Sequence, residues 1–137
     1  MQIRKCTLSD ADKLTELNIQ LIEDEQSDNR MTFPELKERM IGFLNTDYNA
    51  YFFLVDENIA GYALVNMTAN PLYLRQFLID REYRGKHCGK EAFNMLLSQL
   101  GTDEIDLEVL SRNDRGIKFW GNCGFKERSR YMRYTKE

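Results

Sequence analysis

The stretch Phe77-Leu78-Ile79-Asp80-Arg81-Glu82-Tyr83-Arg84-Gly85-Lys86-His87-Cys88-Gly89-Lys90 decides how the rest of the sequence is interpreted. It begins in an apolar run typical of a strand, and a helical pattern of apolar residues follows it as far as Leu97. The segment therefore predicts a strand, a short glycine-containing turn and a helix. At such a turn, free backbone N–H groups and the positive end of the helix dipole favour an anionic phosphate.

Two familiar phosphate-binding motifs do not fit this turn. Gly85 and Gly89 are separated by three residues rather than four, and Glu91 stands where the Ser or Thr of a Walker A loop follows the lysine. The dinucleotide-binding motif fails as well, because no third glycine follows at the required spacing. Lysine and arginine side chains within 84–90 still add positive charge, so the turn is either a phosphate site or a solvated basic surface.

Outward from this turn, periodicity and capping signals predict the other strands and helices. Upstream, we expect a short strand at 1–4, helices over 11–22 and 33–44, a hairpin of 51–55 with 59–66, and a strand over 72–79. Downstream, we expect a helix from about 89 to 100, a strand over 105–110, a short helix carrying Ile117, Phe119 and Trp120, and a last strand over 125–135. This order predicts an α/β fold with helices on both faces of a mixed sheet.

Composition narrows the class of protein. The 137 residues predict one domain spanning 1–137, and 19 basic against 22 acidic residues disfavour nucleic acid as a partner. The longest uncharged stretch, 58–74, is broken by polar residues, so we expect no membrane segment. No signal peptide is visible, and Cys6, Cys88 and Cys123 show no metal-ligand spacing. We therefore expect a cytoplasmic protein with reduced thiols and no metal.

Two motifs carry a resemblance to a known family. Residues 77–90 resemble the acetyl-CoA-binding motif of the GNAT family of N-acetyltransferases, Gln/Arg-x-x-Gly-x-Gly/Ala, with the match Arg84-x-x-His87-x-Gly89. The stretch Asn113 to Phe125 is similar to the family's later motif, Asn-x-x-Ala-x-x-x-Tyr-x-x-x-Gly-Phe. The resemblance implies a single-domain α/β fold with a mixed, mostly antiparallel sheet flanked by about four helices, and acetyl-CoA as cosubstrate.

The same resemblance implies which residues bind acetyl-CoA. The strand end offers backbone groups to the pantetheine arm, the turn holds the pyrophosphate, and the later motif lies along the pantetheine and thiol end. The implied residues are Phe77, Leu78, Ile79, Arg84, Gly85, Lys86, His87, Cys88, Gly89, Lys90, Asn113, Lys118, Phe119 and Trp120.

The sequence departs from the family pattern at two positions. His87 occupies the first motif glycine, and we expect its ring to point into solvent or to make a weak phosphate contact. Trp120 stands where many members place a tyrosine thought to protonate the departing thiolate, and an indole N–H cannot act as that acid. With a thiol pKa near ~8.5, the loss costs on the order of 2 kcal/mol. Tyr131 is the candidate replacement, with Tyr134 and Tyr83 as alternatives.

The acceptor amine must be deprotonated before it attacks, since a primary amine has a pKa near ~10.4. Glu108 is the candidate base, directly or through water, or else a polar-face residue of an alternating strand. The acidic loop 23–28 either attracts a cationic amine or is only solvated. The leading hypothesis is direct acetyl transfer to a small-molecule or peptide amine, with a backbone N–H near Leu78 stabilising the oxyanion. The alternative is a non-catalytic acyl-CoA-binding or regulatory module.

Overall fold

A five-stranded sheet forms the middle of the molecule in the computed structural model, which describes residues 1–137. Its strands are β1 (Gln2–Lys5), β2 (Tyr48–Val55), β3 (Asn58–Asn66), β4 (Leu72–Ile79) and β5 (Ile105–Asp106). They lie in this order across the sheet, and all neighbours are antiparallel except β4 and β5, which are parallel. The mixed, mostly antiparallel sheet predicted from the sequence is confirmed.

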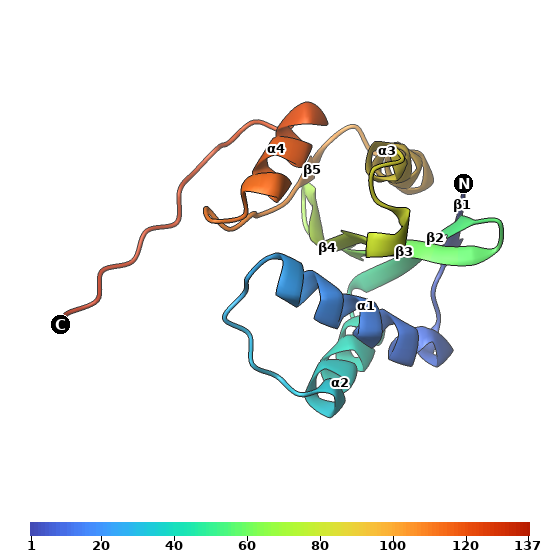
Figure 1. The fold of residues 1–137 in the computed structure, drawn as a ribbon, viewed down its shortest axis with the longest axis horizontal. Coiled ribbons are helices and arrows are strands. Elements are labelled where there is room, and N and C mark those ends of the chain that lie inside the picture. The colour runs from blue at the N-terminus through green and yellow to red at the C-terminus, as the bar shows by residue number, and fades with distance from the viewer.

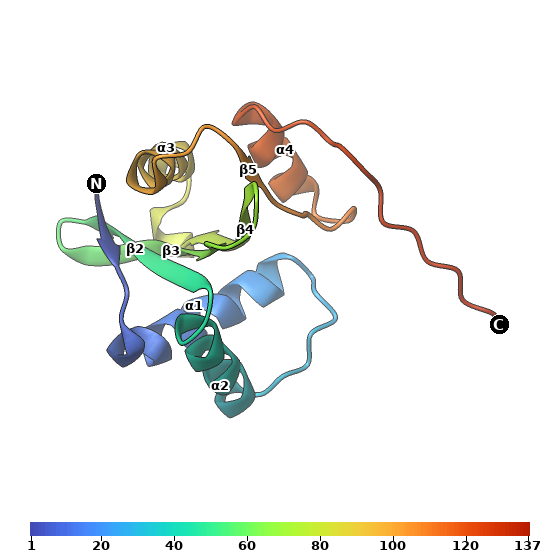
Figure 2. The ribbon, with the colours of Figure 1, turned by 180° about the vertical axis from the view of Figure 1, so that it is seen from behind.

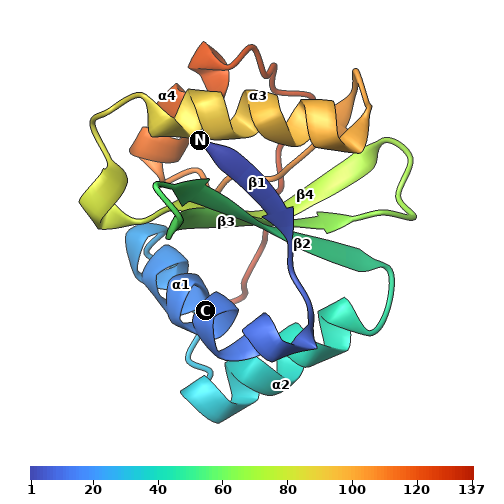
Figure 3. The same cartoon turned by 90° about the vertical axis from the view of Figure 1, so that its right-hand side faces the viewer.

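Helices cover both faces of this sheet, as Figure 3 shows. One face carries α1 (Ala11–Asp24) and α2 (Phe33–Leu44), and the other carries α3 (Cys88–Leu100) and α4 (Asp114–Asn122). Short 3-10 turns, η1 (Leu8–Asp10) and η2 (Arg81–Tyr83), precede α1 and α3. The expected α/β fold with about four helices is therefore confirmed. None of these helices has the length and apolar character needed to cross a membrane.

Local signals in the sequence fix the start of α2. Thr32 accepts a hydrogen bond from the Glu35 amide, and its own amide donates to the Glu35 carboxylate at 2.8 Å, which forms a capping box. Such a cap stabilises a helix by about 1 kcal/mol. With Pro34 in the first turn, α2 begins at Phe33 as predicted.

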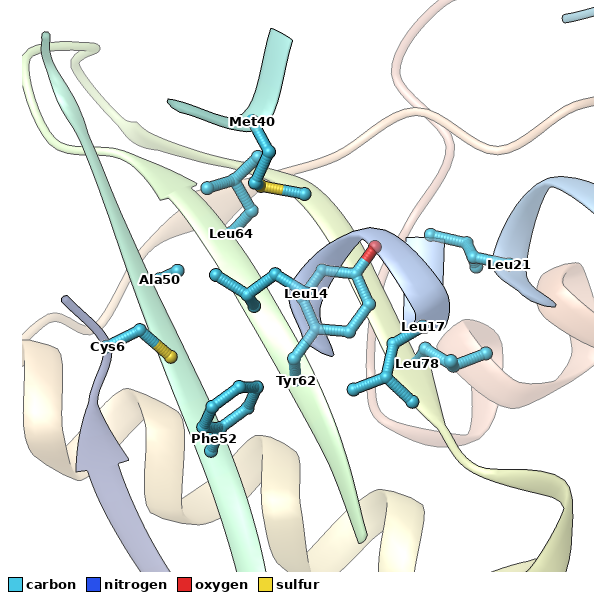
Figure 4. Packing of buried hydrophobic residues seen from close by; sticks show 10 residues of the cluster. All are labelled: Cys6, Leu14, Leu17, Leu21, Met40, Ala50, Phe52, Tyr62, Leu64 and Leu78. Atoms are coloured by element: carbon cyan, nitrogen blue, oxygen red, sulfur yellow. The ribbon is translucent and has the colours of Figure 1, made fainter. Parts of the chain in front are cut away.

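Each face of the sheet has its own apolar core. On the α1/α2 face, Leu14, Leu17, Phe52 and Leu64 pack around Tyr62, whose ring is fully buried (Figure 4). The Tyr62 hydroxyl donates to the Gln76 side-chain oxygen at 2.8 Å. That bond ties β3 to β4, the strand that leads to the turn before α3.

The last strand expected from the sequence, over 125–135, is wrong. Residues 126–137 are all exposed, pair with no strand, and leave the body as an extended tail (Figures 1 and 2). The side chains of Tyr131 and Tyr134 are 82% and 87% exposed. The residues of a segment show only that it could be a strand, because the backbone groups of a strand still need a neighbouring strand to pair with.

The strand expected over 105–110 is also shorter than predicted. The β4–β5 ladder consists of Leu72 with Ile105 and Tyr73 with Asp106, after which the two strands separate. Beyond Asp106 the chain has no regular pairing until α4. A two-residue edge strand offers little backbone for a further strand to join.

Candidate active site

The turn between β4 and α3 presents unpaired backbone donors. Gly85, with φ of 78°, and His87, with φ of 60°, both adopt left-handed conformations, and α3 starts at Cys88. The amides of residues 85–90 donate to no group in the chain, and the first one bonded is that of Glu91, which reaches the His87 carbonyl at 3.4 Å. No side chain caps this helix end. The turn therefore offers a row of N–H groups to an acceptor outside the chain.

A cleft of about 440 Å³ lies beside this turn. It is lined by the end of α1, the end of β4, the turn with the start of α3, and α4. Its lining residues are Leu21, Asp24, Glu25, Phe77, Leu78, Ile79, Arg84, Gly85, His87, Cys88, Gly89, Lys90, Asn113, Arg115, Gly116, Phe119, Trp120, Asn122 and Cys123. The fold thus brings the two motifs of the sequence together around one space.

Gly89 allows α4 to approach the start of α3. A Cβ on this residue would lie 2.7 Å from Cε1 of Phe119, closer than side chains pack. The Phe119 ring is held by its neighbours, with centroids 6.1 Å from Phe77 and 4.7 Å from Trp120. The glycine is therefore required by a close contact across the cleft.

Trp120, in the last turn of α4, belongs to an aromatic cluster. Its ring centroid lies 5.1 Å from Phe77, 5.4 Å from Phe93 and 5.2 Å from Phe125. The indole thus helps to hold α4 against β4 and α3. This packing explains how a tryptophan is accommodated where the family motif has a tyrosine.

An ion-pair network fixes the turn to the end of α1. The Asp24 carboxylate binds both Arg84 and Arg81, and the Arg84 Nε donates to the Ile79 carbonyl at 2.8 Å. Partial burial pushes the pKa of Asp24 upward, but the hydrogen bonds from the two arginines outweigh it, so its pKa is lowered. Arg84 is therefore engaged within the chain. The cations of the cleft that have no carboxylate partner are Lys90 and Arg115.

The edge of β4 that faces β5 becomes free in the middle of the strand. The β4–β5 ladder ends at Tyr73, and Arg75 forms a bulge, since Gln76 pairs with Leu64 and Leu74 with Val65. Burial, and second the neighbouring Glu108, raise the pKa of Tyr73 to about 12. A carboxylate and a phenol thus lie together where the two strands separate.

The structure brings most of the predicted site residues together. All the residues implied to bind acetyl-CoA line the cleft except Lys86 and Lys118, which are exposed on the turn and on α4. The Asn113 side chain also accepts a hydrogen bond from the Gly116 amide at 3.0 Å and so caps α4. The His87 ring is exposed at the rim.

The two predicted catalytic residues lie outside the lining of the cleft. Glu108 follows β5 and is exposed beside Tyr73, whereas Tyr131 lies on the tail. Sequence reasoning missed Glu25, a half-buried cleft residue whose pKa is raised by burial and, second, by Asp24. Glu25 follows α1, far from both motifs in sequence, and only its place in an acidic run marked it.

Comparison with known proteins places these observations in context. The sequence model of the Acetyltransferase (GNAT) family matches residues 17–125. No curated protein sequence matches the chain. The fold is similar to that of a possible acetyltransferase from Clostridium difficile 630, with a TM-score of 0.80 and 16% identity over 99% of this chain and 97% of that one.

Two further solved structures share the fold. One is a ribosomal-protein-alanine N-acetyltransferase from Brucella melitensis biovar Abortus 2308, with a TM-score of 0.71 and 15% identity over 99% of this chain and 98% of that one. The other is the aminoglycoside N-acetyltransferase AAC(6')-Iy in complex with CoA, with a TM-score of 0.74 and 17% identity over 98% and 93% of the two chains.

Proposed function

The chain belongs to the GNAT family of acetyltransferases, and from this premise we propose that it transfers an acetyl group from acetyl-CoA to a primary amine. The observation that carries the proposal is the row of unbonded amides at residues 85–90 beside the cleft. A diphosphate supplies the negatively charged acceptors that such a helix start favours. Lys90 and Arg115 add positive charge to the same space.

The free edge of β4 indicates the direction in which the pantetheine arm of acetyl-CoA would run. Phe77, Leu78 and Ile79 line the cleft, and beyond Tyr73 no residue of β4 pairs with β5. An amide-containing arm can bond to such an edge as an added strand does. With its diphosphate at the turn, acetyl-CoA would extend along β4 from Ile79 back toward Arg75.

The transfer itself needs few groups from the protein. The neutral amine nitrogen attacks the thioester carbonyl carbon and the new C–N bond forms. The nitrogen then gives up a proton to solvent, and the C–S bond breaks with its electron pair leaving on sulfur. A backbone N–H near Leu78 is the candidate donor to the oxyanion. Because the thiol pKa is near ~8.5, the thiolate can take its proton from water, so the proposal does not depend on Tyr131.

The amine must give up a proton to the site, and Glu108 is our candidate to accept it, directly or through water. Its carboxylate lies beside Tyr73, where β4 and β5 separate. The acceptor itself is a small-molecule or peptide amine. Related folds act on both kinds of amine, as the aminoglycoside and ribosomal-protein enzymes show by their names.

Calorimetric titration with acetyl-CoA, followed by an amine screen for CoA release, tests this proposal. We expect acetyl-CoA to bind and to raise the melting temperature, and at least one class of amine to release CoA. Binding without release across a broad panel would favour the acyl-CoA-binding module instead. Absence of any binding would eliminate both functions.

A further inference from the structure

Two arginines from different elements meet at the ring of Phe43. Arg39 lies one turn before Phe43 on α2, and its guanidinium carbon is 5.6 Å from the ring centroid. Arg75 comes from the bulge of β4, and its guanidinium carbon is 4.8 Å from the same centroid. The two cations are therefore no more than about 10 Å apart, the sum of these distances.

Neither arginine has a carboxylate partner. In this chain of net charge −3, Arg4, Arg81, Arg84, Arg112 and Arg130 form ion pairs, whereas Arg39 and Arg75 are among the arginines that do not. Arg39 instead donates to the oxygen of the buried Asn18 side chain at 3.2 Å. Burial, and second the charge of Arg75, lower the pKa of Arg39. The fold thus holds two like charges together without neutralising them.

The position of Arg75 on β4 relates the arginine pair to the acyl end of the proposed acetyl-CoA. Arg75 precedes Phe77, a cleft residue, by two positions on β4, which is about 7 Å along a strand. It lies on the side of Phe77 away from the turn that holds the unbonded amides. Tyr73, beside Glu108, is two positions further on. Neither arginine lines the cleft itself, but Arg75 lies on the stretch of β4 toward which the proposed function directs the acyl end of acetyl-CoA.

Resting on the proposed function, we propose that Arg39 and Arg75 bind an anionic group of the acceptor, so that the substrates are small amines that also carry a carboxylate or a phosphate. A guanidinium offers a planar set of donors that matches either group. Phe43 supports both guanidinium groups through its ring face. A polycationic acceptor would meet repulsion at this position.

Matched pairs of acceptors test the proposal. Free amino acids are compared with their carboxamides, and O-phosphoethanolamine with ethanolamine, by the kcat/KM of CoA release. We expect the anionic member of at least one pair to be preferred about tenfold or more, and the pair that responds identifies carboxylate or phosphate as the ligand. Equal use of both members, or preference for the member without the anionic group, would overturn the inference.

Variants then assign the preference to this pair. Arg75→Gln, on the exposed bulge, is expected to raise the KM of the anionic acceptor about tenfold while the KM of acetyl-CoA stays unchanged. Arg39→Lys keeps the charge but loses the planar donors, and it is expected to give a smaller rise in the same KM. An Arg75→Gln variant that keeps the full preference would overturn the assignment.

Arg4→Gln serves as the matched control. Arg4 also lies over a phenylalanine, at 5.1 Å from the Phe52 centroid, but its charge is paired with Asp10. We expect this variant to keep the acceptor preference of the unmodified chain. If no amine accepts acetyl from the chain, the proposed function fails together with the inference; if only amines without an anionic group are acetylated, only the inference fails.

Discussion

The turn at residues 85–90 and the arginine pair at Phe43 both offer donors to an anion, but they are built from different parts of the chain. The turn uses backbone amides that are contiguous in sequence, whereas the pair uses side chains from α2 and β4. Backbone donors depend on how the chain turns and on what lies against it. Side-chain donors depend on single charges and on the surface that supports them. The two places should therefore respond to different substitutions.

The largest effect is expected at the turn, from Gly89→Ala. The added methyl group would press on Phe119 and force α4 away from α3. We expect acetyl-CoA to bind about tenfold more weakly or worse, and the free energy of unfolding to fall by about 1–3 kcal/mol. Calorimetry and urea unfolding measure the two quantities.

Gly121→Ala on α4 is the control for that variant. A Cβ at Gly121 meets nothing within 4 Å, so the substitution is expected to keep acetyl-CoA affinity and to gain up to about 1 kcal/mol of helix stability. Unchanged affinity in Gly89→Ala would show that the close approach of α4 does not shape the binding site.

A smaller effect is expected from Asp24→Asn, which removes the charge that fixes Arg84 and the turn. We expect a loss of about 1 kcal/mol in unfolding free energy at pH 7, a modest value because the carboxylate is partly solvated. The pKa of Asp24 is lowered on folding, so its stabilisation is present above the ordinary carboxyl pKa of ~3.9 and is lost as pH falls through the lower folded value.

Urea unfolding of both proteins from pH 7 down to pH ~3 measures this dependence. The difference in stability between the two proteins should narrow toward the acid end. Asp28→Asn is the control, because Asp28 pairs with Arg112 while its side chain is 96% exposed. A constant difference between Asp24→Asn and the unmodified chain over the whole pH range would contradict the expected role of this carboxylate.

The substitution Phe43→Leu tests the arginine pair rather than the turn. Leucine keeps an apolar side chain on α2 but removes the ring face beneath the two guanidinium groups. Since such a contact is worth about 0.5–1 kcal/mol, we expect the preference for anionic acceptors to fall about threefold while acetyl-CoA affinity is unchanged. Phe33→Leu, at the exposed start of α2, is the control. A change in acetyl-CoA affinity would mean that the two places are not independent.

The smallest effect on binding is expected from His87→Gly. Glycine adopts the left-handed conformation at this position without steric cost, so we expect a gain of about 1 kcal/mol or less in stability. Because the imidazole is exposed at the rim, acetyl-CoA affinity should change less than about threefold. A large gain in affinity would show that the ring obstructs the amides, and a large loss that it binds phosphate.

Contiguous signals allowed much of this molecule to be predicted. The capping box at Thr32 and Glu35 placed α2, and the apolar run before Asp80 placed β4. The turn was predicted for the same reason, because glycines and basic residues adjacent in sequence mark the start of a helix. Cleft residues on α4 came with the second motif, which lies nearby in the same half of the chain.

Features that depend on distant segments could not be predicted in this way. Arg39 and Arg75 are separated by a hairpin in sequence, and nothing local indicates that a bulge directs Arg75 toward α2. Glu25 reaches the cleft only because α1 packs beside the turn. The strand expected at 125–135 failed for a related reason, since the residues of a segment carry no information about whether a neighbouring strand is available to pair with it.

The tail of residues 126–137 has a practical consequence for handling the protein. Its lysines and arginines lie in extended, fully accessible backbone, so trypsin should cut there first and leave the sheet, the helices and the cleft intact. The same freedom makes the carboxyl end a suitable attachment point for an affinity tag or a surface linker.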